Sequence, residues 1–207
     1  MFADIALPKN NEPEFIELAS KLKLKKIYFL YEFGEYLHEK IPKKLSEIKN
    51  PQKIDIVAGV IVNQKNLNES ARHSKFLVVK SSDKDRVFIE TKKINAIYGF
   101  EEQYKKDFLH QRASGLNHII CELAKRNNIA IGFSYSSLFN KNRQESAMLA
   151  GRMIQNISLC QKYKVKTMIG LFSSNPYEMR AQHDIISLFS VLGMDGKTAR
   201  DSMDYNL

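Results

Sequence analysis

The sequence predicts an α/β fold in which helices cover a parallel sheet, and it favours a closed barrel of about seven strands over a doubly wound sheet. Seven short apolar runs have the length of buried strands, at residues 2–7, 27–31, 53–62, 76–79, 95–100, 129–133 and 167–172. Most are apolar at nearly every position, which is typical of parallel strands covered on both faces. Helical patterns separate most of them at roughly 20 to 35 residues per unit, as in repeated βα units. The compact spacing and the lack of a glycine-rich first turn favour the barrel, with the doubly wound sheet as the open alternative.

The first half of the chain contains three helical patterns. One covers residues 12–22 and carries acidic residues in its first turns, where they suit the helix dipole. A second apolar stripe covers residues 37–48 and is interrupted by Pro42. A shorter helix is expected over residues 83–93.

Residues 114–135 contain the clearest boundary between a helix and a strand. Ser114 is a candidate N-cap for a helix whose apolar stripe includes Ile119 and Ile120. The pair Asn127-Asn128 tolerates left-handed backbone geometry and is expected to end this helix.

The longest helical pattern covers residues 143–164, with Ile154 and Ile157 on its expected inward face. After the seventh strand, a further helix is expected to stop at Gly193, and a short helix is expected to begin at Asp195.

Length and composition predict one domain that covers residues 1–207, since 43% hydrophobic residues can build a large core. No apolar run approaches the length of a membrane-spanning helix, and the starting residues MFADIALP lack the regions of a signal peptide. Cys121 and Cys160 fall within helical patterns, which indicates reduced, buried thiols. These features predict a cytoplasmic protein without a membrane partner.

The net charge of +9 is concentrated in one part of the chain. Residues 103–166 carry 11 Lys and Arg against 3 Asp and Glu, which gives a net charge of +8. Residues 1–102 carry +3 and residues 167–207 carry −2. A concentrated basic surface favours a polyanionic partner, with nucleic acid as the leading candidate, over lysines that only solvate helices.

Motifs for metal, nucleophilic or nucleotide chemistry are missing from the sequence. The histidines show no HxH or HExxH spacing, and the first strand offers only Asp4 as an acid. There is no GxSxG, GxGxxG or Walker sequence, which argues against a serine nucleophile and a nucleotide cofactor. We therefore expect no catalytic residues, no metal and no cofactor in this chain.

Polar and basic residues follow the last three strands, and the carboxyl ends of parallel strands form the functional face of βα barrels. Hydroxyl, amide and guanidinium groups of this kind bind phosphates and sugars. An ion pair between Arg180 and Asp184 is an equally good interpretation of those two residues. In chain order, the candidates are Lys105, Lys106, Arg112, Tyr135, Ser136, Ser137, Asn140, Lys141, Arg143, Asn175, Arg180 and Asp184.

Three blocks of the second half resemble protein component 3 of ribonuclease P, an archaeal family related to a subunit of the eukaryotic enzyme. They are SGLNHIICELAKRNNIAIGFS at residues 114–134, RMIQNISLCQKYKV at residues 152–165 and SSNPYEMRAQHDIISLFSVLGMD at residues 173–195. The blocks have the family's order and spacing, whereas the first half matches only in its βα rhythm. Just before SGLNH the family tends to have a basic residue and then an acid, where this chain has Gln111-Arg112-Ala113. Arg112 can supply the charge from the neighbouring position, but the acid is lost.

The resemblance implies a TIM-like barrel related to metal phosphoesterases but without their metal site. It implies a protein that binds the catalytic RNA of ribonuclease P and acts with a second small protein subunit. Together they would support removal of the 5′ leader from precursor tRNA. By position, the family's functionally implicated residues correspond to His118, Lys162, Arg180 and Asp184, with Arg152 beside them.

The favoured hypothesis is thus an RNA-binding subunit of ribonuclease P with no chemistry of its own. A stand-alone metal-dependent phosphoesterase on the same barrel is the alternative, and it would need a cluster of metal ligands at the strand ends. A purely structural scaffold would leave the basic segment unexplained. The predicted RNA-binding residues are Lys105, Lys106, Arg112, His118, Arg143, Arg152, Lys162, Arg180 and Asp184.

Overall fold

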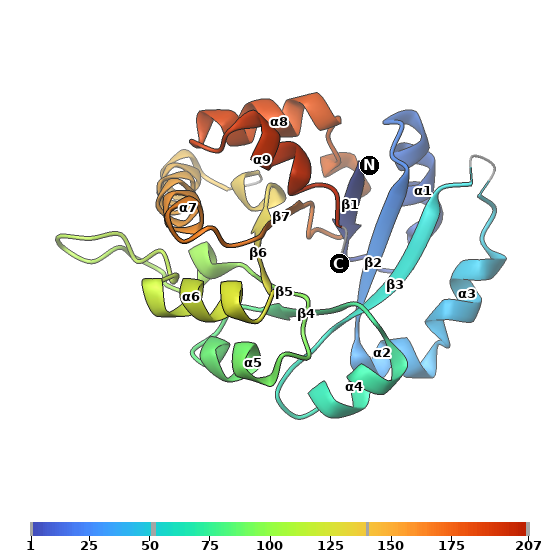
Figure 1. Ribbon diagram of the computed structural model, residues 1–207. Helices are drawn as coiled ribbons and strands as arrows, with labels where there is room; N and C mark the ends of the chain where they lie inside the picture. The colour runs from blue at the N-terminus through green and yellow to red at the C-terminus, as the bar shows by residue number, and fades with distance from the viewer. Residues whose placement is uncertain (1, 51–52, 140, 206–207) are drawn as a thin grey trace.

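The computed structural model describes residues 2–50, 53–139 and 141–205, and it contains a seven-stranded parallel sheet in the order β1 to β7 (Figure 1). Each strand pairs only with its neighbours in sequence, which is the order of a βα barrel rather than a doubly wound sheet. The predicted barrel is therefore confirmed. The strands are β1 (Ala3–Ala6), β2 (Lys26–Glu32), β3 (Asp55–Ile61), β4 (Leu77–Lys80), β5 (Ala96–Tyr98), β6 (Ala130–Ser134) and β7 (Thr167–Gly170).

The barrel is nearly closed at the seam between β1 and β7. At the carboxyl ends of the two strands, Leu7 N donates to Ser173 O at 3.0 Å and Phe172 N donates to Ile5 O at 2.8 Å. At the amino ends the last described residues fill the gap, because Met203 O accepts a hydrogen bond from Ala3 N at 3.0 Å. The end of the chain thus completes the wall of the barrel.

Alternate residues of the strands fill the barrel interior, so that the barrel is a packed core and not a pore. The rings of Tyr98 and Phe172 stack with centroids 4.1 Å apart. A Cβ at Gly132 would lie 2.8 Å from the Cβ of Tyr98, so this strand position needs a glycine for close approach. The interior cluster is Ala3, Ile5, Tyr28, Leu30, Phe76, Val78, Ala96, Tyr98, Ala130, Met168, Phe172 and Tyr205.

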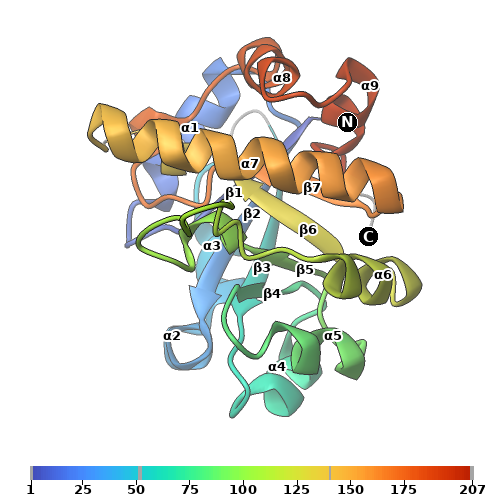
Figure 2. The ribbon, with the colours of Figure 1, turned by 90° about the vertical axis from the view of Figure 1, so that its left-hand side faces the viewer.

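Helices surround the barrel and bury its outer face. The longest of them, α7, lies along the outside of the wall next to β6 (Figure 2). No helix within the described residues is long and apolar enough to cross a bilayer. The helices are α1 (Glu12–Lys21), α2 (Phe33–His38), α3 (Ile41–Glu47), α4 (Leu67–His73), α5 (Asp85–Thr91), α6 (His118–Arg126), α7 (Arg143–Tyr163), α8 (Gln182–Val191) and α9 (Gly196–Asp201), with 3₁₀ turns η1 (Phe100–Glu102), η2 (Ser136–Leu138) and η3 (Pro176–Glu178).

The start of α6 and the presence of α4 differ from the prediction. Helix α6 begins at His118 and not near Ser114, because the side chain of Asn117 accepts the hydrogen bond from Ile120 N and caps the helix. The stop was correct, since Asn128 adopts a left-handed φ of 56°. Helix α4 was not predicted, because residues 67–73 carry too few apolar side chains to show a stripe.

Two isoleucines that were expected inside are on the surface. Ile119 of α6 is 47% exposed and Ile154 of α7 is 46% exposed. In contrast, Ile157 of α7 is 1% exposed and lies in the outer core. The buried stripe of each helix is therefore narrower than the apolar pattern indicated.

This difference gives a matched test of the packing. Ile157→Ala should lower the free energy of unfolding by about 2–5 kcal/mol, because it opens a cavity between α7 and the barrel wall. Ile154→Ala on the same helix should change it by less than about 0.5 kcal/mol. Chemical denaturation of both variants measures the difference, and equal losses would contradict this orientation of α7.

Candidate functional site

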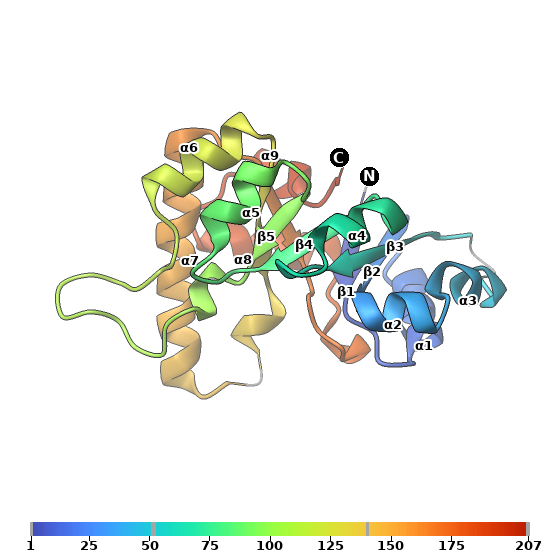
Figure 3. The same ribbon diagram turned by 90° about the horizontal axis from the view of Figure 1, so that it is seen from below.

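The candidate site lies at the carboxyl ends of β5, β6 and β7, where residues 103–117, 135–142 and 171–181 connect to the following helices. The connection over residues 103–117 is long and extends outward from the barrel beside α7 (Figure 3). Its predicted basic residues Lys105 and Lys106 are exposed. The sequence predicted polar and basic residues after the fifth strand, but nothing in it indicated what holds the connection in place.

Arg152 of α7 holds the connection. Its side chain is completely buried, and Nε donates to Oδ1 of Asp107 at 2.7 Å. Nη1 donates to two backbone carbonyl oxygens, Glu101 O at 2.8 Å and Tyr104 O at 2.7 Å. One guanidinium therefore fixes the start and the middle of the connection against α7.

A second buried side chain of α7, Asn156, ties both ends of the connection together. Its Nδ2 donates to Oε1 of Glu101 at 2.8 Å and to Ser114 O at 2.9 Å. Glu101 is fully buried, and this burial raises the pKa of its carboxyl to about 7, although the hydrogen bond from Asn156 lowers it in part. At pH values below about 7 the carboxyl group of Glu101 is thus mostly neutral in the folded protein.

Asp107 shapes the exposed part of the connection. Its Oδ1 accepts a hydrogen bond from Ala113 N at 2.9 Å in addition to the bond from Arg152. Desolvation acts to raise the pKa of this carboxyl, but the bonds from Ala113 and Arg152 outweigh it and lower the pKa. Within the loop that this bond closes, Phe108 N donates to Gln111 O at 3.0 Å.

The guanidinium of Arg112 lies against α7 at Gly151. A Cβ at Gly151 would lie 1.3 Å from Nη1 of Arg112, so the guanidinium occupies the space that a side chain would take. Arg112 itself remains exposed. Two arginines, the buried Arg152 and the exposed Arg112, thus lie where the connection meets α7.

The structure brings most of the predicted residues to one end of the barrel but not all of them. His118 and Arg143 are the first residues of α6 and α7 and are exposed at the carboxyl ends of the strands. At 1.5 Å per residue, Lys162 lies about 28 Å from Arg143 along α7, at the opposite end of the barrel. The basic segment therefore forms two separate regions and not one band.

Arg152 differs from the other predicted residues because it is buried. It was expected to bind RNA, but its side chain is 0% exposed and three of its contacts go to the protein itself. In this structure its three hydrogen bonds position the connection, and the remaining donor, Nη2, is buried without a partner. Asn140 lies outside the described residues.

Arg180 and Asp184 do not form an ion pair with each other within the described part of the chain. Arg180 donates from Nη1 to Tyr177 O at 3.0 Å and to Met179 O at 2.9 Å, and its guanidinium lies 4.9 Å from the ring centroid of Phe139. Asp184 instead lies 3.0 Å from Nε2 of His183. The alternative of an Arg180–Asp184 pair is thus wrong, and Arg180 joins the connections after β6 and β7.

Asp4 of β1 is a buried acid that contacts residues at the carboxyl ends of β6 and β7. Its Oδ1 accepts hydrogen bonds from Ile5 N and Leu171 N, both at 2.8 Å, and its Oδ2 accepts one from the hydroxyl of Tyr135 at 2.6 Å. Burial raises its pKa to about 6, and these bonds lower it in part. Across the described residues, no group of three or more His, Cys, Asp or Glu side chains is arranged to hold a metal ion. Asp4 thus binds β1 to the ends of β6 and β7.

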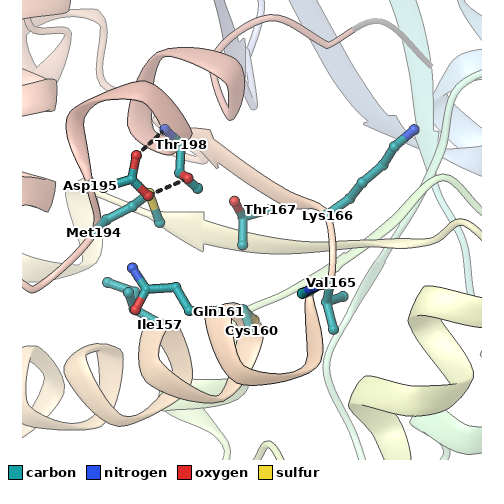
Figure 4. Close-up of a pocket in the computed structure, with 10 residues that line it drawn as sticks. Ile157, Cys160, Gln161, Val165, Lys166, Thr167, Met194, Asp195 and Thr198 are labelled. Carbon is teal, nitrogen blue, oxygen red and sulfur yellow. Dashed lines mark hydrogen bonds between the residues drawn. The ribbon is translucent and has the colours of Figure 1, made fainter.

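A cavity of about 540 Å³ lies far from these connections, between the end of α7, the start of β7 and the turn before α9 (Figure 4). Its polar groups already serve the fold, because Asp195 caps α9 through Lys197 N and Thr198 N. Gln161 donates to Gly193 O at 3.0 Å across it. The cavity is at the amino ends of the strands, and we do not assign it to the candidate site.

The fold and the position of the connections define a parallel βα barrel of the TIM-like class, with its candidate site at the carboxyl ends of the strands. Residues 105–207 match the family model for RNase P subunit p30. The chain is similar to archaeal proteins named ribonuclease P protein component 3, and the resemblance found in its sequence is confirmed.

Ribonuclease P protein component 3 of Thermococcus kodakarensis is 33% identical over 91 residues, which are 44% of this chain and 41% of the relative. That of Thermococcus gammatolerans is 31% identical over 99 residues, 48% of this chain and 46% of the relative. These alignments span less than half the length of either relative. Ribonuclease P protein component 3 of Methanocaldococcus jannaschii is 22% identical over 194 residues, which are 91% of this chain and 82% of the relative.

A chain in a cryo-EM structure of archaeal ribonuclease P with mature tRNA has the same fold. It superposes with a TM-score of 0.75 at 19% identity and covers 98% of this chain and 87% of that chain. A crystal structure of an uncharacterized protein superposes with a TM-score of 0.56 at 8% identity, covering 98% of this chain and 72% of that one. At these identities the superpositions establish the barrel alone.

The buried Glu101 predicts a pH dependence of stability. Its pKa is about 7 in the folded protein and near 4.5 in an unfolded chain, so the folded state holds more protons between these values. The free energy of unfolding should therefore fall as the pH rises from about 4.5 to about 7, by up to about 3 kcal/mol from this group. Glu101→Gln keeps the Asn156 contact and removes the titration.

Denaturant titrations of the parent and Glu101→Gln across this pH range measure the effect. Asp4 also titrates, at lower pH, so the difference between the two curves isolates Glu101. A difference that does not depend on pH would contradict a neutral Glu101.

Proposed function

We propose that this chain is an RNA-binding protein subunit of ribonuclease P, which supports removal of the 5′ leader from precursor tRNA by the catalytic RNA. The observation that carries the proposal is the match of residues 105–207 to RNase P subunit p30, together with archaeal relatives named ribonuclease P protein component 3. The hydrolysis itself would belong to the RNA and its bound metal ions. The chain would stabilise the active fold of that RNA.

The partners follow from the same proposal. They are the catalytic RNA, a second small protein subunit and, in the assembled complex, precursor tRNA. The cryo-EM structure with the matching fold is of archaeal ribonuclease P with mature tRNA, which supports RNA as a partner here. The complex would work in the cytoplasm.

The physical role would be to neutralise phosphates at the carboxyl end of the barrel. Lys105, Lys106, Arg112 and Arg143 are exposed there and carry their charges on or beside the connection that Arg152 holds. His118 and Arg180 lie at the same end, and each can donate a hydrogen bond to a phosphate or sugar oxygen. Cations that replace part of the bound Mg²⁺ would lower the Mg²⁺ concentration that the RNA needs.

Two of the predicted residues would act differently. The carboxylate of Asp184 can only accept hydrogen bonds, so it would contact base amino groups and not phosphates. Lys162 would contact a separate part of the RNA, because it lies about 28 Å from Arg143 along α7.

A stand-alone metal-dependent phosphoesterase is the second candidate. It would need several carboxylate or imidazole ligands near one point at the strand ends. Asp4 has the right location, but its oxygens accept three hydrogen bonds from the protein. The observed contacts give Asp4 a role in closing the barrel, and they favour the RNA subunit.

The salt dependence of RNA binding tests the proposed surface. Each lost phosphate contact should reduce the slope of log affinity against log salt by about 0.7 to 0.9, because fewer counterions are released. The triple variant Lys105→Ala, Lys106→Ala and Arg143→Ala should therefore lose about 2 to 3 from the slope. The melting temperature should hardly change, since all three side chains are exposed.

A charge-matched control separates a specific surface from net charge. Lys25, Lys43 and Lys49 are exposed in the first half of the chain, and their replacement by Ala removes the same three charges. This control should keep the parental slope. Equal slopes for the parent and the first triple variant would remove the RNA contact from the carboxyl end of the barrel.

A further inference from the structure

A cavity of about 310 Å³ lies at the foot of the connection over residues 103–117, between that connection and the first half of α7. This volume is at the lower end of the range of small-molecule sites, about 300–1,000 Å³. It suits one planar group with a short substituent. Its walls are formed chiefly by Tyr104, Lys105, Lys141, Glu145, Met148 and Leu149.

One side of the cavity is apolar and aromatic. Leu149 is buried and Met148 is half-buried on α7, and they provide an apolar floor. The Tyr104 side chain remains 46% exposed, and its ring lies 5.9 Å from that of Phe108. The backbone of Tyr104 is fixed by the hydrogen bond that its carbonyl oxygen accepts from Arg152. An aromatic ring held in this way is a surface on which a base can stack.

The other side of the cavity carries both signs of charge. Lys105 and Lys141 are exposed and form no ion pair within the described residues, so their ammonium groups are available to a phosphate. Glu145 is likewise unpaired there, whereas the other carboxylate, Glu102, lies 3.2 Å from Lys80. At the back of the cavity, Nη2 of the fully buried Arg152 has no hydrogen-bond partner.

A site for phosphate alone would not combine these groups, because a free carboxylate repels an anion. A nucleotide can interact with the aromatic ring, the carboxylate and the ammonium groups at the same time. Its base can stack on an aromatic ring, its amino or imino hydrogens can donate to a carboxylate, and its phosphate can bind the ammonium groups. The charges and the ring of this cavity match that set.

We propose that this cavity receives one unpaired, unstacked nucleotide of the RNA partner, with its base against Tyr104 and its phosphate at Lys105 and Lys141. The inference rests on the proposed function and makes it more specific. The bases of an A-form duplex are stacked and enclosed, so only a single-stranded or bulged nucleotide can enter. The carboxylate of Glu145 would accept a hydrogen bond from the base.

Binding of the full chain to a short single-stranded RNA and to a fully paired RNA duplex tests this inference. Tyr104→Ala should weaken the single-stranded complex about 5- to 150-fold, the usual range for loss of one stacked base, and leave the duplex affinity unchanged. Tyr104→Phe keeps the ring and should retain the parental affinity. Val191→Ala, which truncates an exposed apolar side chain at the far end of α8, is the control and should have no effect.

The outcomes separate this inference from the proposed function. If the parent binds neither RNA, the proposed function fails. If the parent binds both but Tyr104→Ala weakens neither, or weakens both equally, only the nucleotide cavity is contradicted. A selective loss on the single strand that Tyr104→Phe restores would support it.

Discussion

The guanidinium of Arg152 is the group on which the functional end of this barrel depends. A buried guanidinium is costly unless its donors are satisfied, and here an ion pair to Asp107 and two carbonyl oxygens satisfy Nε and Nη1 and leave only Nη2 without a partner among the described residues. The connection over residues 103–117 has little regular structure beyond η1, so these bonds largely determine its path. Because α7 packs on the barrel wall, the bonds of Arg152 hold the backbone of the connection in a fixed position on the barrel. The exposed lysines and Tyr104 are on this connection. The barrel thus supports the connection, and the connection carries the exposed residues that are proposed to contact RNA.

Much of the fold could be predicted from the sequence because strands buried on both faces appear as continuous apolar runs. All seven strands were located in this way. Helix α4 was missed because its surface is mostly polar, and the start of α6 was misplaced because Ser114 and Asn117 are both acceptable caps in sequence. Only the hydrogen bond from Ile120 N to Asn117 distinguishes them. The closure of the barrel between β1 and β7 by the residues after α9 was not predictable, because no local sequence pattern indicates that Met203 bonds to Ala3.

The candidate site was predicted less completely, because the net charge of a segment does not show which of its basic residues lie at the same end of the barrel. Helices α6 and α7 run from the carboxyl ends of the strands to the opposite end, and they divide the basic segment into two regions. The burial of Arg152 did leave a signal: Leu149, Arg152 and Asn156 follow at helical spacing, so they share one face of α7. An arginine on a buried stripe indicates a structural role. Glu101, Asp107 and Tyr104 gave no such signal, because their partners are distant in sequence.

The most direct test of the account is the Mg²⁺ concentration needed for leader cleavage by the catalytic RNA together with the partner subunit. Adding this chain should lower that concentration, because its cations take over part of the phosphate neutralisation. Asp107→Ala, which removes the bonds from Arg152 and from Ala113 N that hold the outer part of the connection, should lose much of this effect. A parental chain that leaves the Mg²⁺ requirement unchanged would contradict the account.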